Sequence, residues 1–95
     1  MSAYVIIDVE VKDQEQYAKY MKAGALTIIS HGGKPLVRGG KTENWEGDWQ
    51  PKRVIVLEFK TIEEARNWWN SSDYTQAKKL RQVAAQANVI CAEGI

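Results

Sequence analysis

The sequence contains one histidine, His31, the only side chain whose charge changes near neutral pH without help from its surroundings. As a general base, His31 would need a carboxylate to orient its imidazole ring, and Asp8 or Glu58 could supply one. Alternatively, His31 closes the last turn of a helix, where a positive charge suits the helix dipole. The sequence leaves both interpretations open.

Arg38 and Glu58 are charged residues within predicted strands, and alternation places both on one mixed face of the sheet. Arg38 could anchor the carboxylate of a ligand through two parallel hydrogen bonds. It could equally pair with Glu58 or Asp8 across neighbouring strands, since a buried arginine needs an anionic partner. Glu58 could act as an acid or base if burial kept it protonated, whereas an ion pair with Arg38 would keep it ionised.

Arg81, Trp69 and Tyr74 lie in the helical segments of the C-terminal half. Arg81 falls on the inner stripe of its helix and presents the same choice between a ligand and an ion pair, of which we favour the ion pair. Trp69 and Tyr74 belong to the core or to the wall of a pocket. If the chain has a ligand site, these three residues, together with Arg38 and Asp8, are its ligand-binding candidates.

Residues 41–51 form a polar segment that contains Trp45 and Trp49 but has no core of its own. Aromatic side chains in such a segment more often anchor a protein interface than contact a substrate. We therefore predict a short strand or arm through 42–46 and a turn at Gly47-Asp48. Both tryptophans are predicted to lie at a dimer interface.

Composition excludes several classes of function. One cysteine and one histidine cannot build a zinc site within a monomer, so we predict no metal and no cofactor. The net charge is +1, and no loop has the glycine-rich pattern that holds phosphates, so no nucleic acid partner is expected. No apolar stretch approaches the roughly 20 residues that cross a bilayer. The single cysteine and the absence of a signal peptide make the cytoplasm the expected location.

The apolar pattern predicts one domain over residues 1–95 with the order βαββαβ. The strands are predicted over 3–11, 34–40, 53–59 and 89–93, and the helices over 13–31, 61–70 and 71–85. This order gives an α+β, ferredoxin-like sandwich, in which a four-stranded antiparallel sheet has its helices on one face. The other face is too apolar to stay bare, which predicts a homodimer through it; its apolar residues are Tyr4, Ile6, Leu36, Val54 and Val56.

Several groups of residues have a familiar spacing: Leu36-Val37-Arg38-Gly39-Gly40, Glu46-Gly47-Asp48-Trp49 with Pro51 and Arg53, Glu58-Phe59, Trp68 with Asn70-Ser71 and Tyr74, Leu80-Arg81, and Glu93-Gly94. With this pattern the whole chain resembles the small bacterial family called domain of unknown function 1330. The resemblance implies a dimeric α+β barrel, a superfamily that includes cofactor-free monooxygenases, isomerases and haem-degrading enzymes. It implies no particular reaction. Haem degraders of this superfamily place an iron-ligating histidine in a later helix, and residues 61–85 contain none.

Two functions are compatible with these observations. The first is a cofactor-free enzyme, of isomerase or monooxygenase type, that acts on a small anionic or aromatic metabolite. In it Arg38 would hold the ligand, His31 or Glu58 would move the proton, and Trp69 and Tyr74 would form the wall. The second is a non-catalytic binding or structural dimer, in which the same polar groups pair among themselves. A pocket on which His31 and Arg38 converge would favour the enzyme.

Overall fold

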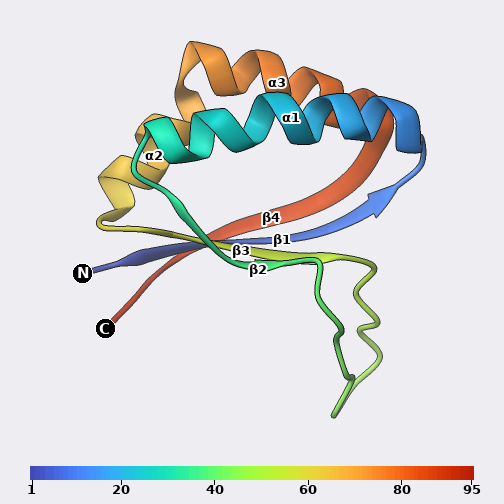
Figure 1. Cartoon of the computed structure of the whole chain (residues 1–95). Coiled ribbons are helices and arrows are strands. Elements are labelled where there is room, and N and C mark those ends of the chain that lie inside the picture. The colour runs from blue at the N-terminus through green and yellow to red at the C-terminus, as the bar shows by residue number, and fades with distance from the viewer.

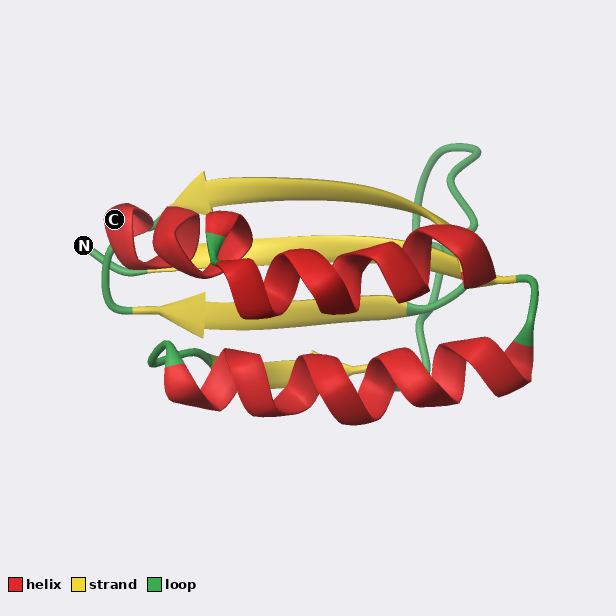
Figure 2. Ribbon diagram, turned by 90° about the horizontal axis from the view of Figure 1, so that it is seen from above, coloured by secondary structure: helices red, strands yellow, loops and turns green.

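The computed structural model describes all residues, 1–95. Its elements are β1 (Ala3–Val11), α1 (Gln14–Ser30), β2 (Lys34–Arg38), β3 (Val54–Phe59), α2 (Ile62–Asn70), α3 (Ser72–Ala84) and β4 (Ala85–Glu93). The strands form one antiparallel sheet in the order β2-β3-β1-β4. All three helices cover the same face of this sheet (Figures 1 and 2), as the sequence predicts.

The helices begin where the sequence supplies a capping side chain. Asp13 Oδ1 accepts a hydrogen bond from the Gln16 amide at 3.1 Å, and Thr61 Oγ1 accepts one from the Glu64 amide at 3.1 Å. Ser71 ends α2 and begins α3, because its hydroxyl accepts from the Tyr74 amide at 3.2 Å. These caps satisfy amides that would otherwise have no partner at the start of a helix.

The boundaries differ from the prediction at two places. β4 begins at Ala85 instead of Val89, because it pairs with β1 along its whole length, from Val11 opposite Ala85 to Ala3 opposite Glu93. Alanine, glutamine and asparagine have low strand propensity, which pairing with a long neighbouring strand overrides here. Residues 42–46 form no strand, and the arm, defined as residues 41–51, is an irregular loop. In Figure 1 it extends away from the sheet on the side opposite the helices.

The core is aromatic, and its polar atoms are paired inside it. Trp68 and Tyr74 are fully buried. Trp68 Nε1 donates to Thr27 Oγ1 at 3.1 Å, and the hydroxyls of Tyr74 and Tyr20 lie 3.1 Å apart. Trp68 occupies the centre of the core, and Trp69 is partly buried and packs against the core at its edge.

The face of the sheet without helices, called here the outer face, is apolar at its centre. Ile6 lies between Val56 of β3 and Ile90 of β4. Ile90 is 60% exposed and continues this apolar strip onto the edge strand β4. Cys91, the next residue of β4, is exposed as well. None of the three helices has the length and hydropathy of a membrane span.

The turn between α1 and β2 brings the backbone so close to the core that only glycine fits. A Cβ atom on Gly33 would lie 2.7 Å from Ile28 Cγ2 and 2.7 Å from Phe59 Cζ. We therefore expect Gly33→Ala to lower the free energy of unfolding by about 1 to 3 kcal/mol, as overpacking does. Gly40→Ala is the matched control, since a Cβ there meets no atom within 4 Å. Urea unfolding of the two variants measures the difference, and equal stabilities would contradict this account of the turn.

Candidate functional site

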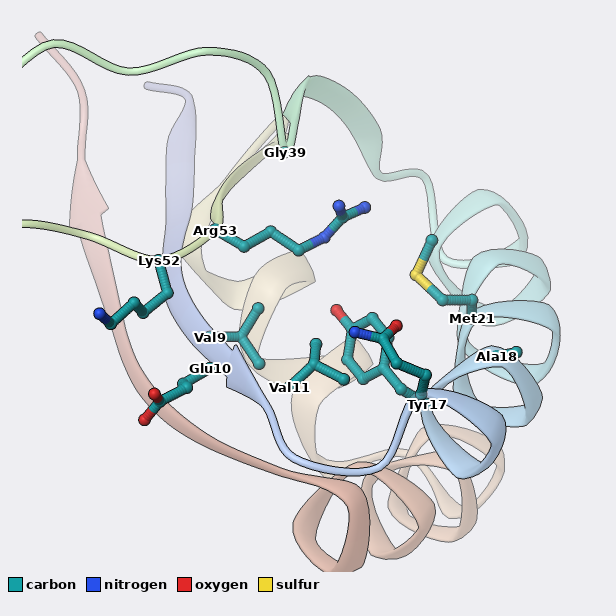
Figure 3. A pocket seen from close by; sticks show the side chains of 10 residues that line it. Val9, Glu10, Val11, Tyr17, Ala18, Met21, Gly39, Lys52 and Arg53 are labelled. Atoms are coloured by element: carbon teal, nitrogen blue, oxygen red, sulfur yellow. The ribbon is translucent and has the colours of Figure 1, made fainter.

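A cleft of about 560 Å³ opens between the first turns of α1 and the end of the sheet where β1 ends and β3 begins. Figure 3 shows it from close by. The residues that line it come from β1, α1 and the segments flanking β2 and β3: Val9, Glu10, Val11, Gln14, Tyr17, Ala18, Met21, Gly39, Lys52 and Arg53. We call the space between these residues the cleft.

Arg53 and Tyr17 face each other across the cleft. In Figure 3 the Arg53 side chain extends from the start of β3 towards Tyr17 and Met21, whereas the side chain of Lys52 points away. Tyr17 is 5% exposed. Both the Tyr17 hydroxyl and Arg53 Nε are buried, and neither meets the geometry of a hydrogen bond with another group, although Arg53 lies close enough to oppose the rise in the pKa of Tyr17. Buried polar atoms without a partner are rare in folded proteins, which marks this pair as a candidate for ligand contact.

Glycine at position 39 lets Arg53 adopt this position. A Cβ on Gly39 would lie 2.5 Å from Arg53 Nη1, and Gly39 has a φ of 72°, which side chains other than glycine rarely adopt. The Gly39 amide also donates to the Val54 carbonyl at 2.8 Å. Because Gly39 has no side chain, the Arg53 guanidinium lies close to the backbone at the end of β2.

The Tyr17 hydroxyl is a proton donor at neutral pH. Burial raises its pKa above the ordinary value, and the positive charges of Arg53 and Arg81 oppose that shift without cancelling it. A protonated hydroxyl beside an arginine presents two donors and a positive charge to the same space. Such a group of donors suits an oxygen anion.

Arg81 is the second buried cation near Tyr17. It is 5% exposed, and its guanidinium carbon lies 5.9 Å from the centre of the Tyr20 ring. The ion pair predicted for Arg81 is absent. The chain has two side-chain ion pairs, Lys12 with Glu10 at 3.1 Å and His31 with Asp73 at 3.2 Å. Arg81 is held instead by the face of an aromatic ring, which attracts a cation.

Arg38 lies on the helix side of the sheet, not on the outer face as predicted. Lys34 lies opposite Glu58, but the register shifts between Pro35 and Val37, so that Val37 lies opposite Val56 and Arg38 opposite Ile55. A bulge of one residue moves every later side chain to the other face. The predicted pair of Arg38 with Glu58 or Asp8 is therefore not formed, and Arg38 has no ion-pair partner.

Glu58 and Asp8 remain on the outer face, away from the cleft. Glu58 Oε2 accepts a hydrogen bond from the Tyr4 hydroxyl at 3.1 Å. Asp8 Oδ2 accepts from Trp49 Nε1 at 2.9 Å, and Asp8 Oδ1 accepts from the Lys52 amide at 3.0 Å. Because Lys52 precedes Arg53, Asp8 fixes the backbone that carries Arg53 into the cleft. Asp8 therefore contacts this segment from the outer face of the sheet.

His31 is not part of the cleft. It is the C-cap of α1, and its Nε2 atom lies 3.2 Å from Asp73 Oδ1 at the start of α3. The carboxylate beside it is thus Asp73, and the prediction that Asp8 or Glu58 orients the ring is wrong. His31 and Arg38 do not converge on one pocket. The structure supports the alternative in which the histidine closes a helix.

Trp69 and Tyr74 also lie outside the cleft. Tyr74 is fully buried in the core, and Trp69 is covered by Lys78, whose Nζ atom lies 3.9 Å from the ring centre. Trp45 and Trp49 are 88% and 62% exposed in the arm. No group of three or more histidine, cysteine, aspartate or glutamate side chains is placed to hold a metal ion.

Sequence reasoning misses the two residues that face each other in the cleft. It gives Tyr17, within the predicted helix 13–31, no chemical role, and it places Arg53 at the start of the predicted strand 53–59. Two signals are present in the sequence. The hydroxyl of a tyrosine in a buried part of a helix needs a polar partner. Arg53 belongs to the group of residues that carries the family resemblance.

The comparisons with known proteins assign the family. The model of the family described as Domain of unknown function (DUF1330) matches residues 2–95. The chain belongs to this DUF1330 family. No curated protein matches the sequence.

Solved structures share the fold of this DUF1330 protein at low sequence identity. The RPA0582 protein of unknown function from Rhodopseudomonas palustris has a TM-score of 0.79 and 19% identity, over 99% of this chain and 82% of that chain. SnoaB, a cofactor-independent oxygenase from Streptomyces nogalater, has a TM-score of 0.69 and 6% identity, over 99% of this chain and 93% of that chain. A dimeric ferredoxin-like protein of unknown function from Jannaschia sp. CCS1 has a TM-score of 0.69 and 10% identity, over 99% of this chain and 100% of that chain. These likenesses confirm the predicted ferredoxin-like fold.

The contacts of Asp8 make a prediction about pH. The hydrogen bond from Trp49, helped by that from the Lys52 amide, lowers the pKa of Asp8 below its ordinary value. Stability from a lowered pKa is present above the pKa of the unfolded chain, about 3.9, and is lost as the pH falls through the folded pKa. We expect Asp8→Asn to cost up to about 1 kcal/mol at pH 7, because the side chain is partly exposed, and less at pH 3, where protonation has begun to remove the contribution of the charge.

Urea unfolding at both pH values measures this difference. Asp48→Asn in the arm is the control, because Asp48 is exposed and makes no hydrogen bond or ion pair. A loss for Asp8→Asn that is the same at both pH values would show that the charge of Asp8 is not what holds the arm.

Proposed function

We propose that this protein binds a small anionic metabolite in the cleft, with Arg53 and Tyr17 as the groups that contact the anion. The observation that carries the proposal is that the Tyr17 hydroxyl and Arg53 Nε are buried at the cleft and have no partner. A bound carboxylate would satisfy both donors at once, since each of its oxygens accepts more than one hydrogen bond.

The distribution of charge supports the same proposal. Arg38, Arg53 and Arg81 lie on the helix side of the sheet, and none of them forms an ion pair. The carboxylates of Glu58 and Asp8 lie on the other face, where they bond to Tyr4, Trp49 and Lys52. The lining of the cleft carries two cations, Lys52 and Arg53, and one carboxylate, Glu10, which pairs with Lys12 at 3.1 Å. The net positive charge that remains favours an anion over a neutral ligand.

A cofactor-free reaction in the same cleft is the second candidate. A protonated tyrosine beside a cation is suited to stabilise negative charge that develops on a substrate oxygen. The similarity of fold to a cofactor-independent oxygenase is compatible with this idea. Because His31 and Glu58 lie outside the cleft, Tyr17 would have to move the proton. The contacts support binding more directly than turnover.

Thermal unfolding tests the anion site. A ligand at about ten times its Kd stabilises the folded state by about 1.4 kcal/mol, which raises the Tm of a domain of this size by several degrees. We expect acetate, compared with chloride at the same ionic strength, to raise the Tm of the wild type and to have no effect on Arg53→Met. Lys79→Met removes one exposed charge from α3 and should respond like the wild type.

Arg81→Met adds a second readout to this experiment. Replacing a buried, unpaired charge by an apolar side chain of similar length often stabilises a protein. We expect Arg81→Met to raise the Tm without acetate and to reduce the response to acetate. If wild type and Arg53→Met respond equally to acetate, the cleft is not the anion site.

We also propose that the protein is a homodimer that pairs through its outer face. Ile6, Val56 and Ile90 form an apolar strip there, and the arm extends on the same side (Figure 1). Two proteins of similar fold are described as dimeric, which is compatible with this pairing. The exposed tryptophans of the arm would then contact the partner, as the sequence analysis predicts.

Light scattering at micromolar concentration tests the dimer. We expect twice the chain mass for the wild type and a monomer for Ile90→Lys, since a charge buried at the centre of an apolar interface is costly. Leu26→Lys places the same charge on an exposed position of α1, where Leu26 is 72% exposed, and should remain a dimer. A monomeric wild type would refute the pairing.

A further inference from the structure

A second, apolar cavity lies beside the cleft on the same side of the sheet. It has a volume of about 130 Å³ and is enclosed by α1 on one side and by β1, β2 and β3 on the other. Ile7, Ile55 and Leu57 form its floor and Ile28 part of its wall, while Arg38 contributes the only charged side chain. We call this cavity the groove.

The groove and the cleft are neighbours, because they share a lining residue. Met21 lines both of them. The end of β2 also borders both, because Arg38 lines the groove and the next residue, Gly39, lines the cleft. In Figure 3 the Met21 side chain extends towards Gly39 and lies beside the Arg53 guanidinium. An unbranched methionine changes rotamer easily, so it can open this boundary at little cost.

The sequence of α1 keeps the groove open along the helix. Gly24 is buried and lines the groove, and a Cβ on it would lie 3.2 Å from Tyr20 Cε1. A side chain at this position would therefore enter the space that the groove occupies. The small Ala25 follows it on the rim. Glycine in the middle of a helix lowers stability by about 1 kcal/mol relative to alanine. An open groove beside α1 is a structural reason for glycine at this position.

The size of the groove limits what it can hold. An engineered apolar cavity of about 150 Å³ in another protein binds one benzene molecule. At about 130 Å³, the groove has room for about one group of this size. Its lining is aliphatic and aromatic; Arg38 is its one charged side chain, and the Tyr20 hydroxyl is already paired with that of Tyr74.

From this geometry we infer that the ligand is a carboxylic acid anion with one apolar group of about the size of a phenyl ring, which lies in the groove under α1. The carboxylate would bind Arg53 and Tyr17 in the cleft, as the proposed function requires, and this inference rests on that function. Met21 would turn aside at the boundary. Arg38 would add a second positive charge near the same boundary.

Calorimetric titration with three probes tests the inference: acetate, phenylacetate and the neutral phenylacetamide. We expect the wild type to bind phenylacetate about 100-fold more tightly than acetate, because the ring leaves water for an apolar cavity. Phenylacetamide should bind at least about tenfold more weakly than phenylacetate, since it lacks the charge that Arg53 pairs with. Arg53→Met should lose the binding of both acids.

A matched pair of variants on α1 locates the ring. Ala25→Phe adds a phenyl group on the rim, and a helical side chain leans over the preceding turn, where Met21 lies. We expect it to reduce the affinity for phenylacetate at least about tenfold and to leave acetate binding unchanged. Leu26→Phe, one residue further on and outside the groove, should bind both acids like the wild type. In the wild type, ring protons of bound phenylacetate should show nuclear Overhauser effects to the methyl groups of Ile28 and Ile55.

The outcomes separate this inference from the function on which it rests. Equal affinities for acetate and phenylacetate, both lost in Arg53→Met, would overturn the apolar group and leave the anion site standing. No binding of either acid would overturn both. Tight binding of phenylacetate and phenylacetamide alike, unchanged in Arg53→Met, would show an apolar cavity unconnected to the cleft and would also overturn the inference.

Discussion

The position of α1 over the sheet depends on two buried hydrogen bonds between aromatic and hydroxyl side chains. Tyr20 of α1 meets Tyr74 of α3 at 3.1 Å, and Trp68 of α2 donates to Thr27 of α1 at 3.1 Å. These side chains fix the direction of the helix because an unpaired polar atom in the core is costly, and Thr27 Oγ1 both accepts from Trp68 and donates to the Gly24 carbonyl at 2.7 Å. Both the cleft and the groove lie along the same helix. Their shapes therefore depend on the contacts that hold this helix in place, and Tyr20 itself lines the groove.

The arginines beside the cleft and the groove lie on the opposite face of the sheet from Asp8 and Glu58. On the helix side, Arg38, Arg53 and Arg81 form no ion pair. On the outer face, Asp8 and Glu58 are satisfied by neutral donors. This separation keeps the arginines from being neutralised within the chain, so they remain available to a ligand. Unpaired buried charge lowers stability, and proteins commonly accept such a cost at sites of function.

Sequence reasoning predicts the architecture well because it depends on short-range patterns. Alternation locates β1 and β3, and Asp13 and Thr61 locate the starts of two helices. The inner stripe of α3 is largely right, since Tyr74, Ala77, Arg81 and Ala84 are all buried. The site is predicted poorly because its residues meet only through the tertiary fold. Tyr17 and Arg53 are 36 positions apart, and nothing near either one in the sequence indicates that they share a cleft.

Arg38 illustrates the limit most clearly, since its strand is predicted correctly, whereas its face and its partner are not. One extra residue between Pro35 and Val37 decides on which side of the sheet its charge lies. An alignment of related chains that places a gap one residue away from this bulge would therefore compare side chains that point in opposite directions. In such a comparison, an arginine that is retained at the same column could have changed its surroundings completely. In this strand, residues of family members should be matched by strand register before their identities are compared.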